Sequence, residues 1–503
     1  MKIFSAEQIR ACDAYTIHAS GIRSIDLMER AAVKAVEWLT ARFDTNTLFV
    51  VLCGAGNNGG DGLAITRLLH RQGYGAKAFL LKHAEHFSAD CFANLQRLQQ
   101  TGTDLVELLS QGMFITDIPP HIIIIDAILG TGLNRPVEGW LADFIRHVNQ
   151  LPNRKVAIDT PSGLPADTVP VKEAAVVQVK ETLSFQFYKR SFLHPEGGRF
   201  AGDVHILDIN LDSSFISSTH TSYETIDDVR QWYEPRNPFA HKGTFGSALM
   251  IGGSYGMIGA IALATHAVLR SGAGKVRALI PQCGYEIMQT AIPEAMCATS
   301  GEGCLTEIGG WEGMQAIGIG PGIGTDPTTV EAFTSFLEAC KQPLVIDADA
   351  LNILAKHADL LGKIPAGSVL TPHPKEFERM FGAVPDSMAQ VEHARAQAMR
   401  YNISIVLKGH HTAVITPEGA CWYNLTGNAG MATGGSGDVL CGLIAGLMAQ
   451  GYEPDVAAIM GVYVHGKAGD LAAAALSQEA MIAGDIINYL GNVFLEIADG
   501  RFL

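Results

Sequence analysis

Two glycine-rich segments of the chain carry polar side chains in positions suited to phosphate binding and proton transfer. The more specific one is TGGSGDVLCG, residues 433–442. Its glycines free backbone N–H groups to face an anion at the start of a helix. Asp438 follows directly, where a carboxylate could accept the proton of a substrate hydroxyl during phosphoryl transfer. Asp438 could instead be a first-turn acid favoured by the helix dipole, but a cap does not need the preceding glycines, so we favour the catalytic interpretation.

The second segment, VVLCGAGNNGGDG (50–62), is typical of a strand, a glycine turn and a helix. Its spacing matches the dinucleotide fingerprint, in which a diphosphate meets a helix N-terminus. That fingerprint expects an acidic residue about 20 residues later, whereas here the next strand-like run, AKAFLL, is followed by lysine and histidine. The turn also carries Asn57, Asn58 and Asp61, which an ordinary dinucleotide loop does not need. We predict a ligand-binding loop of a different kind.

Two further strand-like runs end in polar groups. Asp126 follows HIIII and Asp159 follows KVAI, with Ser162 three residues further on. Ligands of open parallel sheets bind beyond the carboxyl ends of the strands, so these groups and the 57–61 loop should meet at one rim. A lone aspartate after a strand is usually a helix cap, but three such strand ends in one domain favour a site. The oxygens of Asn, Asp and Ser suit a hard alkali or alkaline-earth cation.

Other segments of the second half are consistent with a nucleotide site. SIVLKGHHT ends a strand and continues with Lys408, Gly409, His410, His411 and Thr412, which we interpret as contacts of a purine nucleotide. His373 lies between prolines after another strand, where a ligand contact and a structural role both stay open. In PLVIDAD we interpret Asp349 as a helix cap or a member of a hydrogen-bond network. The sequence has neither a P-loop motif nor the protein-kinase motifs.

The elements that must position these groups alternate between strand and helix in both halves. Apolar runs such as LFVVLC, KVAID and ETLSF between residues 47 and 205 are separated by helical stretches, which indicates parallel strands covered on both faces. A second alternating block begins at ALMIGG, and residues 434–490 are helical in pattern with many small residues. The polar stretch 212–228 lies between the blocks. We predict an α/β chain with one domain over 1–212, a linker over 213–224 and a second domain over 225–503.

Composition excludes several classes of protein. The 503 residues are 48% hydrophobic and 17% charged, which excludes a disordered chain. The formal net charge of −15 opposes nucleic-acid binding, which needs basic excess. No apolar tract reaches the ~20 residues of a membrane span, the charged N-terminus is unlike a signal peptide, and the nine cysteines show no zinc spacing. We therefore expect a cytoplasmic protein that binds neither nucleic acid nor a membrane.

GNNGGDG, DAILGTGLNRP and IDTPSG together resemble the N-terminal domain of the YjeF family, the NAD(P)H-hydrate epimerases, over nearly all of residues 1–212. The resemblance implies a Rossmann-like open sheet and a hydrated dinucleotide bound by two loops and by Asp159. The residues of those loops are Asn57, Asn58, Gly59, Gly60, Asp61, Gly130, Thr131, Gly132, Leu133, Asn134, Arg135 and Pro136. It also implies that Asn58, Asp126 and Ser162 bind K⁺. Epimerising a carbinol carbon needs proton transfer at the hydroxyl and a stabilised cationic or ring-opened intermediate, and we assign that role to Asp159.

HKG, IGGS, RSGAG, GPG, DADALN, TPHPKE, LKGHHT and GGSGD resemble the C-terminal domain of the same family, from about residue 225 to 500. This second resemblance implies a ribokinase-like fold and ADP-dependent NAD(P)H-hydrate dehydratase activity. Contacts with the hydrated dinucleotide would come from Ala260, Gly322, His373 and Asp438. The adenine nucleotide, accompanied by Mg²⁺, would be held by Lys408, Gly409, His410, His411, Thr412 and Gly437.

The two domains together imply repair of hydrated NAD(P)H, by epimerising its R and S forms and dehydrating the S form with ADP. Hydroxide is a poor leaving group, so phosphorylating the hydroxyl, with Asp438 as the base, lets phosphate leave instead and releases AMP. In-line phosphoryl transfer suits one epimer only, and the epimerase would convert the other. We expect NAD(P)H hydrates and ADP as partners, and a homo-oligomer.

Two alternatives remain open at this point. One is a ribokinase-type small-molecule kinase whose first half senses a nucleotide, which the three rim motifs disfavour. The other is a non-catalytic NAD-binding module, which Asp159 and Asp438 disfavour.

Overall fold

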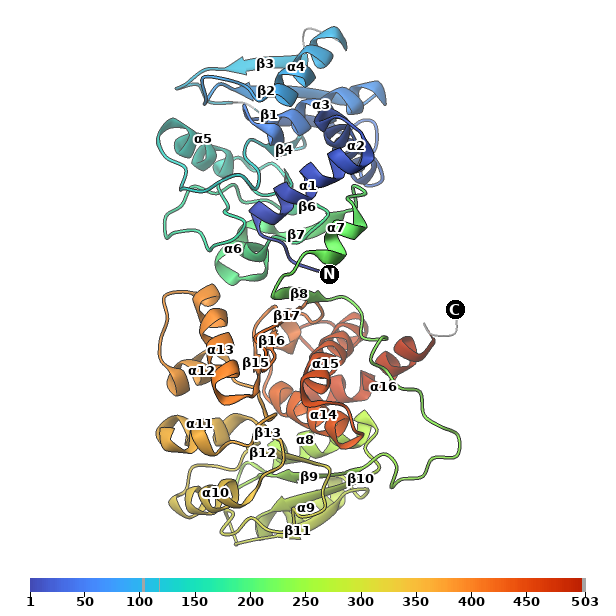
Figure 1. Ribbon diagram of the computed structural model, residues 1–503, viewed down its shortest axis with the longest axis vertical. Coiled ribbons are helices and arrows are strands. Elements are labelled where there is room, and N and C mark those ends of the chain that lie inside the picture. The colour runs from blue at the N-terminus through green and yellow to red at the C-terminus, as the bar shows by residue number, and fades with distance from the viewer. Residues whose placement is uncertain (102–104, 117, 500–503) are drawn as a thin grey trace. The chain divides into compact units, whose positions relative to one another are not determined.

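The computed structural model describes residues 1–101, 105–116 and 118–499. The chain forms two compact units, Met1–Thr221 and Ser222–Leu503 (Figure 1). The stretch 213–224, expected to be a linker, is not irregular. It contains helix α7 (Ser213–Ser218), whose first N–H groups are capped by the Asp212 carboxylate, and the start of strand β8 (Tyr223–Ile226). Short polar elements of this kind have no apolar periodicity by which the sequence could reveal them.

The first unit is built on a seven-stranded sheet in the order β3-β2-β1-β4-β5-β6-β7, and every neighbouring pair is parallel. The strands are β1 (Leu48–Cys53), β2 (Gly75–Leu81), β3 (Val106–Leu109), β4 (Ile123–Ala127), β5 (Lys155–Ile158), β6 (Glu181–Phe185) and β7 (Asp203–Leu207). The helices are α1 (Ala6–Ser20), α2 (Ser24–Thr40), α3 (Asn57–Arg71), α4 (Ala89–Thr101), α5 (Gly139–Gln150), α6 (Pro195–Ala201) and α7, with a 3₁₀ turn at Arg190–Leu193.

Helices cover both faces of this sheet, as the continuous apolar strands predicted. Side chains of β1 alternate between two cores: Val51 packs with α2, α3 and α4 on one face, and Leu52 packs with α5 on the other. Figure 1 shows α5 on the opposite side of the strands from α2 and α3. The predicted Rossmann-like open sheet is therefore confirmed.

The second unit contains a ten-stranded mixed sheet in the order β11-β10-β9-β12-β13-β14-β15-β16-β17-β8. It is parallel from β11 to β15, antiparallel at β15-β16-β17, and parallel again where β8 joins β17. Its strands after β8 are β9 (Ser247–Ile251), β10 (Lys275–Ile280), β11 (Met296–Thr299), β12 (Ala316–Ile319), β13 (Leu344–Ile346), β14 (Val369–Leu370), β15 (Ser404–Leu407), β16 (Ala413–Ile415) and β17 (Cys421–Asn424).

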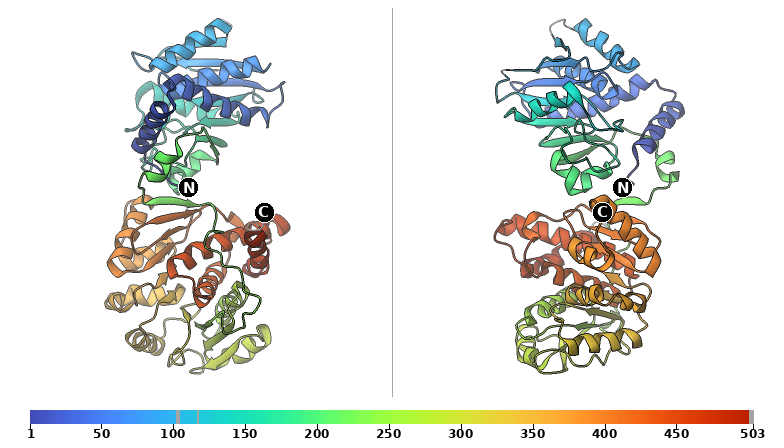
Figure 2. Two further views of the ribbon diagram at one scale, coloured as in Figure 1. Left: turned by 45° about the vertical axis from the view of Figure 1, so that its right-hand side comes forward. Right: turned by 90° about the vertical axis from the view of Figure 1, so that its left-hand side faces the viewer.

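The helices of this unit also lie on both faces of the sheet, with α10 to α13 on one side and α14 to α16 on the other (Figures 1 and 2). They are α8 (Ile258–Ser271), α9 (Tyr285–Ala291), α10 (Pro327–Ala339), α11 (Ala348–Lys356), α12 (Pro374–Phe381), α13 (Ser387–Tyr401), α14 (Ser436–Ala449), α15 (Pro454–Leu476) and α16 (Ala483–Asp499). The 3₁₀ turns are Gln282–Gly284, Ala358–Lys363 and Ala429–Met431.

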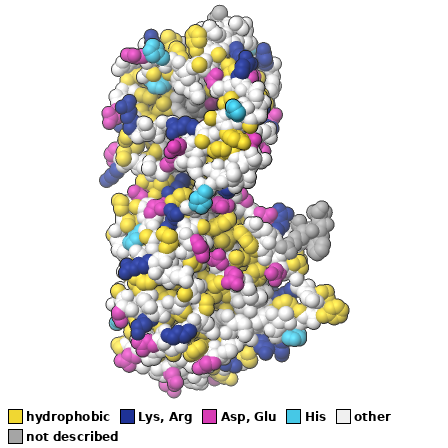
Figure 3. All heavy atoms as spheres, viewed as in Figure 1, with side chains coloured by type: hydrophobic (Ala, Val, Ile, Leu, Met, Phe, Trp, Pro, Cys, Tyr) yellow, Lys and Arg dark blue, Asp and Glu magenta, His cyan; other side chains and the backbone are white. Residues whose placement is uncertain are grey.

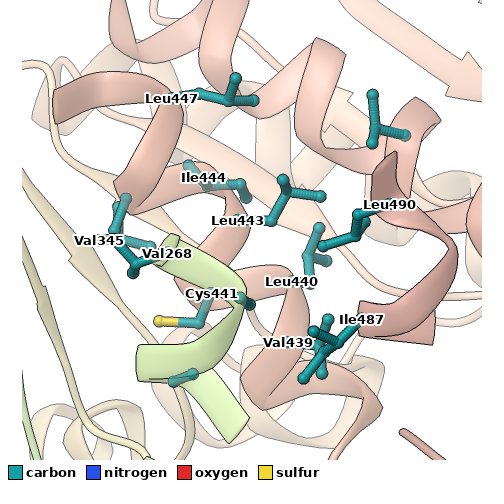
Figure 4. Packing of buried hydrophobic residues seen from close by; sticks show 14 of the residues in the cluster. Val268, Val345, Val439, Leu440, Cys441, Leu443, Ile444, Leu447, Ile487 and Leu490 are labelled. Atoms are coloured by element: carbon teal, nitrogen blue, oxygen red, sulfur yellow. The ribbon is translucent and has the colours of Figure 1, made fainter. Parts of the chain in front are cut away.

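Helix α14, which begins at the GGSGD motif, is the centre of the largest core cluster. Figure 4 shows Leu440, Leu443 and Ile444 of α14 among side chains of α8, α16 and strand β13. Two glycines let α14 approach α8 closely, because a Cβ on Gly442 would overlap the carbonyl oxygen of Ala264 and one on Gly446 would overlap the Ser271 hydroxyl. This close contact with α8 helps to fix the position of α14.

The face shown in Figure 3 carries acidic and basic side chains interspersed with apolar ones. Among the helices of the described residues, none is long and apolar enough to cross a bilayer.

Two candidate active sites

In the first unit, a cavity of about 640 Å³ lies beyond the carboxyl ends of β1, β4 and β5. The three polar strand ends expected to converge do meet around it. Sequence-predicted residues that line the cavity are Asn57, Asn58, Asp61, Gly130, Thr131, Gly132, Leu133, Asn134, Arg135 and Asp159. Helices α1 and α2 also line it, with Arg10, Asp13, Leu27 and Met28, among others.

Oxygen atoms cluster at one side of this cavity, around the carbonyl of Leu129. Asn58 donates its amide N–H to that carbonyl at 2.9 Å, and the Ser162 hydroxyl lies 3.3 Å from it. Ser162 also donates to the Asp126 carboxylate at 2.5 Å. The side-chain oxygen of Asn58 is buried without a hydrogen-bond partner among the described residues. Asn58, Asp126 and Ser162 are thus brought together, and an unpaired buried oxygen of this kind is a polar group that a cation would satisfy.

Asp159 occupies a left-handed backbone conformation, with φ of 63°, directly after β5. Aspartate tolerates this conformation better than most residues other than glycine, and residues held in it cluster at functional sites. Its carboxylate accepts a hydrogen bond from the ammonium of Lys189 at 2.5 Å. The Lys189 side chain is fully buried, and it also donates to the Ser184 hydroxyl. The ion pair therefore holds the carboxylate of Asp159 in place at the wall of the cavity.

Two further carboxyl groups share this cavity with Asp159. Burial, followed by the charges of Asp159 and Asp13, raises the pKa of Asp61 well above its ordinary value. Burial and the charge of Asp159 also raise the pKa of Asp13 to about 7, although Lys189 opposes the shift. A carboxyl group that titrates near neutral pH can both give and accept a proton under physiological conditions.

Five residues implied by the resemblance are not among those that line this cavity. Asp126 and Ser162 lie beside it, bonded to each other, with the Ser162 hydroxyl 3.3 Å from the Leu129 carbonyl. Gly59 and Gly60 are buried in the first turn of α3, where a Cβ on Gly59 would overlap the Gly54 carbonyl and one on Gly60 would lie 2.8 Å from the sulfur of Met28. Both therefore serve close packing. Pro136 lines a neighbouring cavity of about 410 Å³, which shares the loop 131–135 with the first.

In the second unit, a separate cavity of about 640 Å³ lies beside the N-terminus of α14. The sequence-predicted residues that line it are His373, Lys408, Gly409, His410, Thr412 and Gly437. Its other polar walls come from β17 and the segment after it, with Asn424, Thr426 and Asn428. Gly435, at the cap of α14, has φ of 90°, which requires glycine in this turn.

Lys408 places a positive charge at the start of α14. Its ammonium donates to the buried carboxylate of Asp347 at 2.9 Å, and a Cβ on Gly437 would lie 3.2 Å from the same nitrogen. Burial lowers the pKa of Lys408, but the charges of Asp347 and Glu376 outweigh it, so the pKa is raised and the group stays protonated. The ammonium, the free N–H groups of α14 and the helix dipole together favour an anion at this end of the cavity.

Asp438 follows Gly437 in the first turn of α14 and is partly buried. Burial and the charge of Asp347 raise its pKa to about 7, while Lys408 opposes the shift and Asp349 adds to it. Asp438 is not among the residues lining the 640 Å³ cavity, although its neighbours Ser436, Gly437 and Leu440 are. Its carboxyl group is thus coupled electrostatically to Asp347, Lys408 and Asp349.

Asp349, in the first turn of α11, is bonded to the glycine-rich turn that follows β12, because its carboxylate accepts the Gly324 N–H at 3.1 Å. The interpretation of Asp349 as a network member is therefore confirmed. Gly322 lies in the same turn with φ of 63°, and a Cβ on it would meet the Cβ of Ala260 at 3.2 Å. Ala260 and Gly322 are therefore neighbours, although neither lines the cavity beside α14.

The histidines differ in their surroundings. His373 caps α12, where its ring accepts the N–H groups of Lys375 and Glu376, so it has a structural role and also lines the cavity. His411 does not line the cavity: its ring lies 3.2 Å from the Asn424 carbonyl, and burial lowers its pKa to about 4.

Four residues of these sites were not predicted from the sequence. Asp13 and Lys189 belong to the first site, and Asp347 and the buried His465, which lies 3.0 Å from the Ser436 carbonyl, belong to the second. These residues occur in sequence contexts that are common in proteins, such as a charged residue on a helix or an aspartate at the end of a strand, so they did not stand out. A charged residue within an otherwise apolar face is the signal that could have revealed Asp13, which lies four residues from both Ile9 and Ile17 on α1.

Comparisons with known proteins agree with this arrangement. The model of the YjeF-related protein N-terminus matches residues 24–191, and the NAD(P)H-hydrate dehydratase model matches residues 248–492. The bifunctional NAD(P)H-hydrate repair enzyme of Moorella thermoacetica is 35% identical over 99% of this chain and 98% of its own length. The Escherichia coli enzyme of the same name is 32% identical over 98% of this chain and 93% of its own length.

Among solved structures, an ADP/ATP-dependent NAD(P)H-hydrate dehydratase of Bacillus subtilis, co-crystallised with ATP and Mg²⁺, is 31% identical with a TM-score of 0.48. It covers 55% of this chain and 98% of its own. The full-length matches to the curated relatives confirm the resemblance found in the sequence. The chain belongs to the family of bifunctional NAD(P)H-hydrate repair enzymes, in which an epimerase domain and a dehydratase domain are fused.

Proposed function

We propose that the cavity of the first unit epimerises hydrated NAD(P)H, and that the cavity of the second unit, together with Asp438, dehydrates the S epimer with ADP. The observation that carries the proposal is the pairing of two cavities with carboxyl groups suited to proton transfer. Asp159 is held by Lys189 at the wall of the first, and Asp438, with a pKa of about 7, stands at the helix that borders the second.

In the first site, we assign proton transfer at the substrate hydroxyl to Asp159. The loops 57–61 and 130–136 are the proposed binding segments for the dinucleotide. Loss of the hydroxyl, or opening of the ring, creates positive charge beside the ring nitrogen, and the carboxylates of the cavity stabilise that charge.

K⁺ is the proposed cation of this site. Its fit is supported by the unpaired buried oxygen of Asn58, the neighbouring Leu129 carbonyl, and the oxygens of Ser162 and Asp126. All are hard neutral or anionic oxygen donors, which suit an alkali cation. When bound, K⁺ would satisfy these oxygens and fix the loop that contains Leu129 and Gly130. Among the described residues no group of three His, Cys, Asp or Glu side chains could hold a metal, so the proposed donors are mainly amide, hydroxyl and carbonyl groups.

In the second site, we propose that ADP lies in the 640 Å³ cavity with its β-phosphate at the start of α14. Lys408 and the N–H groups around Gly437 would neutralise and orient that phosphate. Asp438 accepts the proton of the substrate hydroxyl. The hydroxyl oxygen bonds to the β-phosphorus of ADP, and AMP leaves. The ring nitrogen then expels phosphate from the neighbouring carbon, and loss of a ring proton restores the reduced nicotinamide.

Mg²⁺ is the proposed companion of the nucleotide. This ion binds largely through phosphate oxygens and water and needs only one or two carboxylates from the protein. Asp347 and Asp438 lie near the start of α14, close enough for the charge of Asp347 to raise the pKa of Asp438. Mg²⁺ would reduce the repulsion between these carboxylates and the phosphates.

Product analysis tests the dehydratase half of the proposal. Purified S hydrate is incubated with the protein and ADP, and reduced nicotinamide, AMP and phosphate are measured. We expect the three products in equal amounts. Release of AMP without reduced nicotinamide, or a product that keeps the phosphate, would instead indicate an ordinary small-molecule kinase.

The R hydrate tests the epimerase half in the absence of ADP. We expect the wild type to convert it to a mixture of epimers much faster than the uncatalysed reaction. Asp159→Asn should fold normally and lose this activity. If that variant keeps full activity, Asp159 is not part of the mechanism. A homo-oligomer and a cytoplasmic location stay predictions of the sequence.

A further inference from the structure

The first cavity contains a carboxyl group that the epimerase mechanism above does not use. Asp13 comes from α1, far in sequence from every motif of the site, yet it lines the same cavity as Asp61 and Asp159. The ammonium of Lys189 pairs directly with Asp159 at 2.5 Å, whereas Asp13 has no hydrogen bond or ion pair to a described side chain. The two carboxyl groups therefore stand in one cavity with different partners.

From this arrangement we propose that Asp13 is the second acid–base catalyst of epimerisation, acting on the face of the nicotinamide ring opposite Asp159. The inference rests on the proposed epimerase function of the first unit.

The reaction needs two proton-transferring groups if the hydroxyl departs from one face and returns to the other. Asp13 in its acid form protonates the hydroxyl, the bond between carbon and oxygen breaks, and water leaves. The electron pair of the ring nitrogen stabilises the cation. A water molecule then adds to the opposite face and gives its extra proton to the Asp159 carboxylate. The product is the other epimer, one proton has moved from Asp13 to Asp159, and exchange with solvent restores the starting state.

The reverse reaction uses the same two groups in exchanged roles, so the pair must hold one proton between them. This is the arrangement of two carboxyl groups in enzymes that act on opposite faces of a sugar ring. Asp13 is suited to hold that proton, because burial and the charge of Asp159 raise its pKa to about 7. The two carboxyl groups titrate as a coupled pair, and a rate profile reports the pair.

The other charged groups around Asp13 are compatible with this role. Asp61 comes from α3, and burial, followed by the charges of Asp159 and Asp13, raises the pKa of Asp61 well above its ordinary value, which favours its neutral form. Arg10 on α1 and Arg135 after β4 line the same cavity, and Lys189 lies behind Asp159. Helix α2 contributes only Ser24, Leu27, Met28 and Ala31 to the cavity, none of which titrates near neutral pH.

Substitution of Asp13 tests the proposal directly. General acid–base catalysis contributes roughly 10²–10⁴-fold, so Asp13→Asn should lower the kcat for R-to-S conversion at least about 100-fold and leave KM within about threefold. Asp13→Glu should recover part of the lost rate. Asp143→Asn, a matched change at an exposed position of α5, should leave the rate unchanged. An Asp13→Asn variant with a kcat within threefold of wild type would overturn the proposal.

Two measurements keep the proposal testable if Asp13→Asn does not fold. The kcat of the wild type should pass through a maximum as pH is varied, with one limb near pH 7, because the carboxyl pair must hold one proton; a flat profile between pH 5 and 9 would contradict this. In water enriched in ¹⁸O, each conversion of one epimer to the other should introduce labelled oxygen. Complete epimerisation with unlabelled oxygen would show that the hydroxyl never leaves.

The failure of this inference can be told apart from failure of the proposed function. If the wild type does not accelerate epimerisation at all, the epimerase assignment is wrong. If the wild type is active and Asp13→Asn is equally active, only the role of Asp13 is wrong.

Discussion

The base of the dehydratase site gives a prediction whose size follows from the structure. Burial and the charge of Asp347 raise the pKa of Asp438 to about 7, and the proposed mechanism needs the ionised form to accept the substrate proton. For a single group of this pKa, the ionised fraction is ~10% at pH 6 and ~90% at pH 8. With saturating S hydrate and ADP, and with phosphoryl transfer limiting, the dehydration rate should therefore rise roughly ninefold over this range.

The Asp438→Asn variant removes the proton acceptor and keeps the shape of the side chain. We expect its kcat to fall by about 10²–10⁴-fold and its dependence on pH between 6 and 8 to disappear. The assay is the recovery of reduced-nicotinamide absorbance from the pure S epimer, under single-turnover conditions to isolate the chemical step. Asp359→Asn, at an exposed position of a 3₁₀ turn, is the matched control and should behave like the wild type.

Stability distinguishes a catalytic defect from a folding defect in this variant. Because the native pKa of Asp438 lies above the unfolded value, the native state binds a proton more tightly than the unfolded chain, and the stability of the wild type falls as pH rises from about 4 to about 7. Asp438→Asn removes this loss, so it should be at least as stable as the wild type at pH 8. A wild-type rate that is flat from pH 6 to 8, or an Asp438→Asn variant of normal kcat, would refute the assignment of Asp438 as the base.

Three further predictions concern the cation site, the ion pair and the helix packing. Replacing K⁺ by a bulky organic cation should slow epimerisation by the wild type, and Asn58→Ala should be slow in both salts; equal wild-type rates in the two salts would exclude a K⁺ requirement. Lys408→Met leaves the buried Asp347 carboxylate unpaired, which should lower the free energy of unfolding by on the order of 3–5 kcal/mol. The loss of the ammonium should also raise the KM for ADP. The double variant Lys408→Met/Asp347→Asn should recover the stability but not the KM. Gly442→Ala should destabilise the second unit by roughly 1–3 kcal/mol in denaturant unfolding, because its Cβ would overlap the Ala264 carbonyl. Gly491→Ala on α16, where a Cβ meets nothing within 4 Å, should raise stability slightly; a Gly442→Ala variant of equal stability would show that α8 and α14 can separate at no cost.

The sequence predicted the central strands well because their burial leaves a strong pattern. The run LFVVLC matches β1 and ETLSF matches β6, since strands covered on both faces are apolar throughout. The missed strands are β3, β8, β11 and β17, and three of them lie at a sheet edge. Strand β3, for example, exposes Glu107 and Leu108, so its composition resembles that of a loop. An edge strand is specified by its neighbour as much as by its own residues.

The residues of the candidate sites were also only partly predictable from the sequence. Asn58, Asp126 and Asp159 could be found because a parallel sheet brings the ends of its strands together, whatever the details of packing. Asp13 and Lys189 were not assigned to the site, because α1 and the segment after β6 reach the cavity only through tertiary packing; for Asp13 the sequence offered at most a charged position on an otherwise apolar helix face. In the second unit the sequence drew attention to Asp349, while the structure pairs Asp347 with Lys408. Two aspartates that flank one residue cannot be told apart until the backbone direction between them is known, and here Ala348 has φ of 51°.

The central claim is that one chain acts on both epimers of the same damaged coenzyme through two different sites. An equal mixture of R and S hydrates with excess ADP tests it most directly, when the recovery of reduced nicotinamide is followed to completion. We predict complete recovery of reduced nicotinamide with the wild type. In the same time, Asp159→Asn should recover only the half that starts as the S epimer, and Asp438→Asn should recover none. A wild type that stops at half would contradict the claim that the first site is an epimerase, and a wild type that restores no reduced nicotinamide would contradict the whole account.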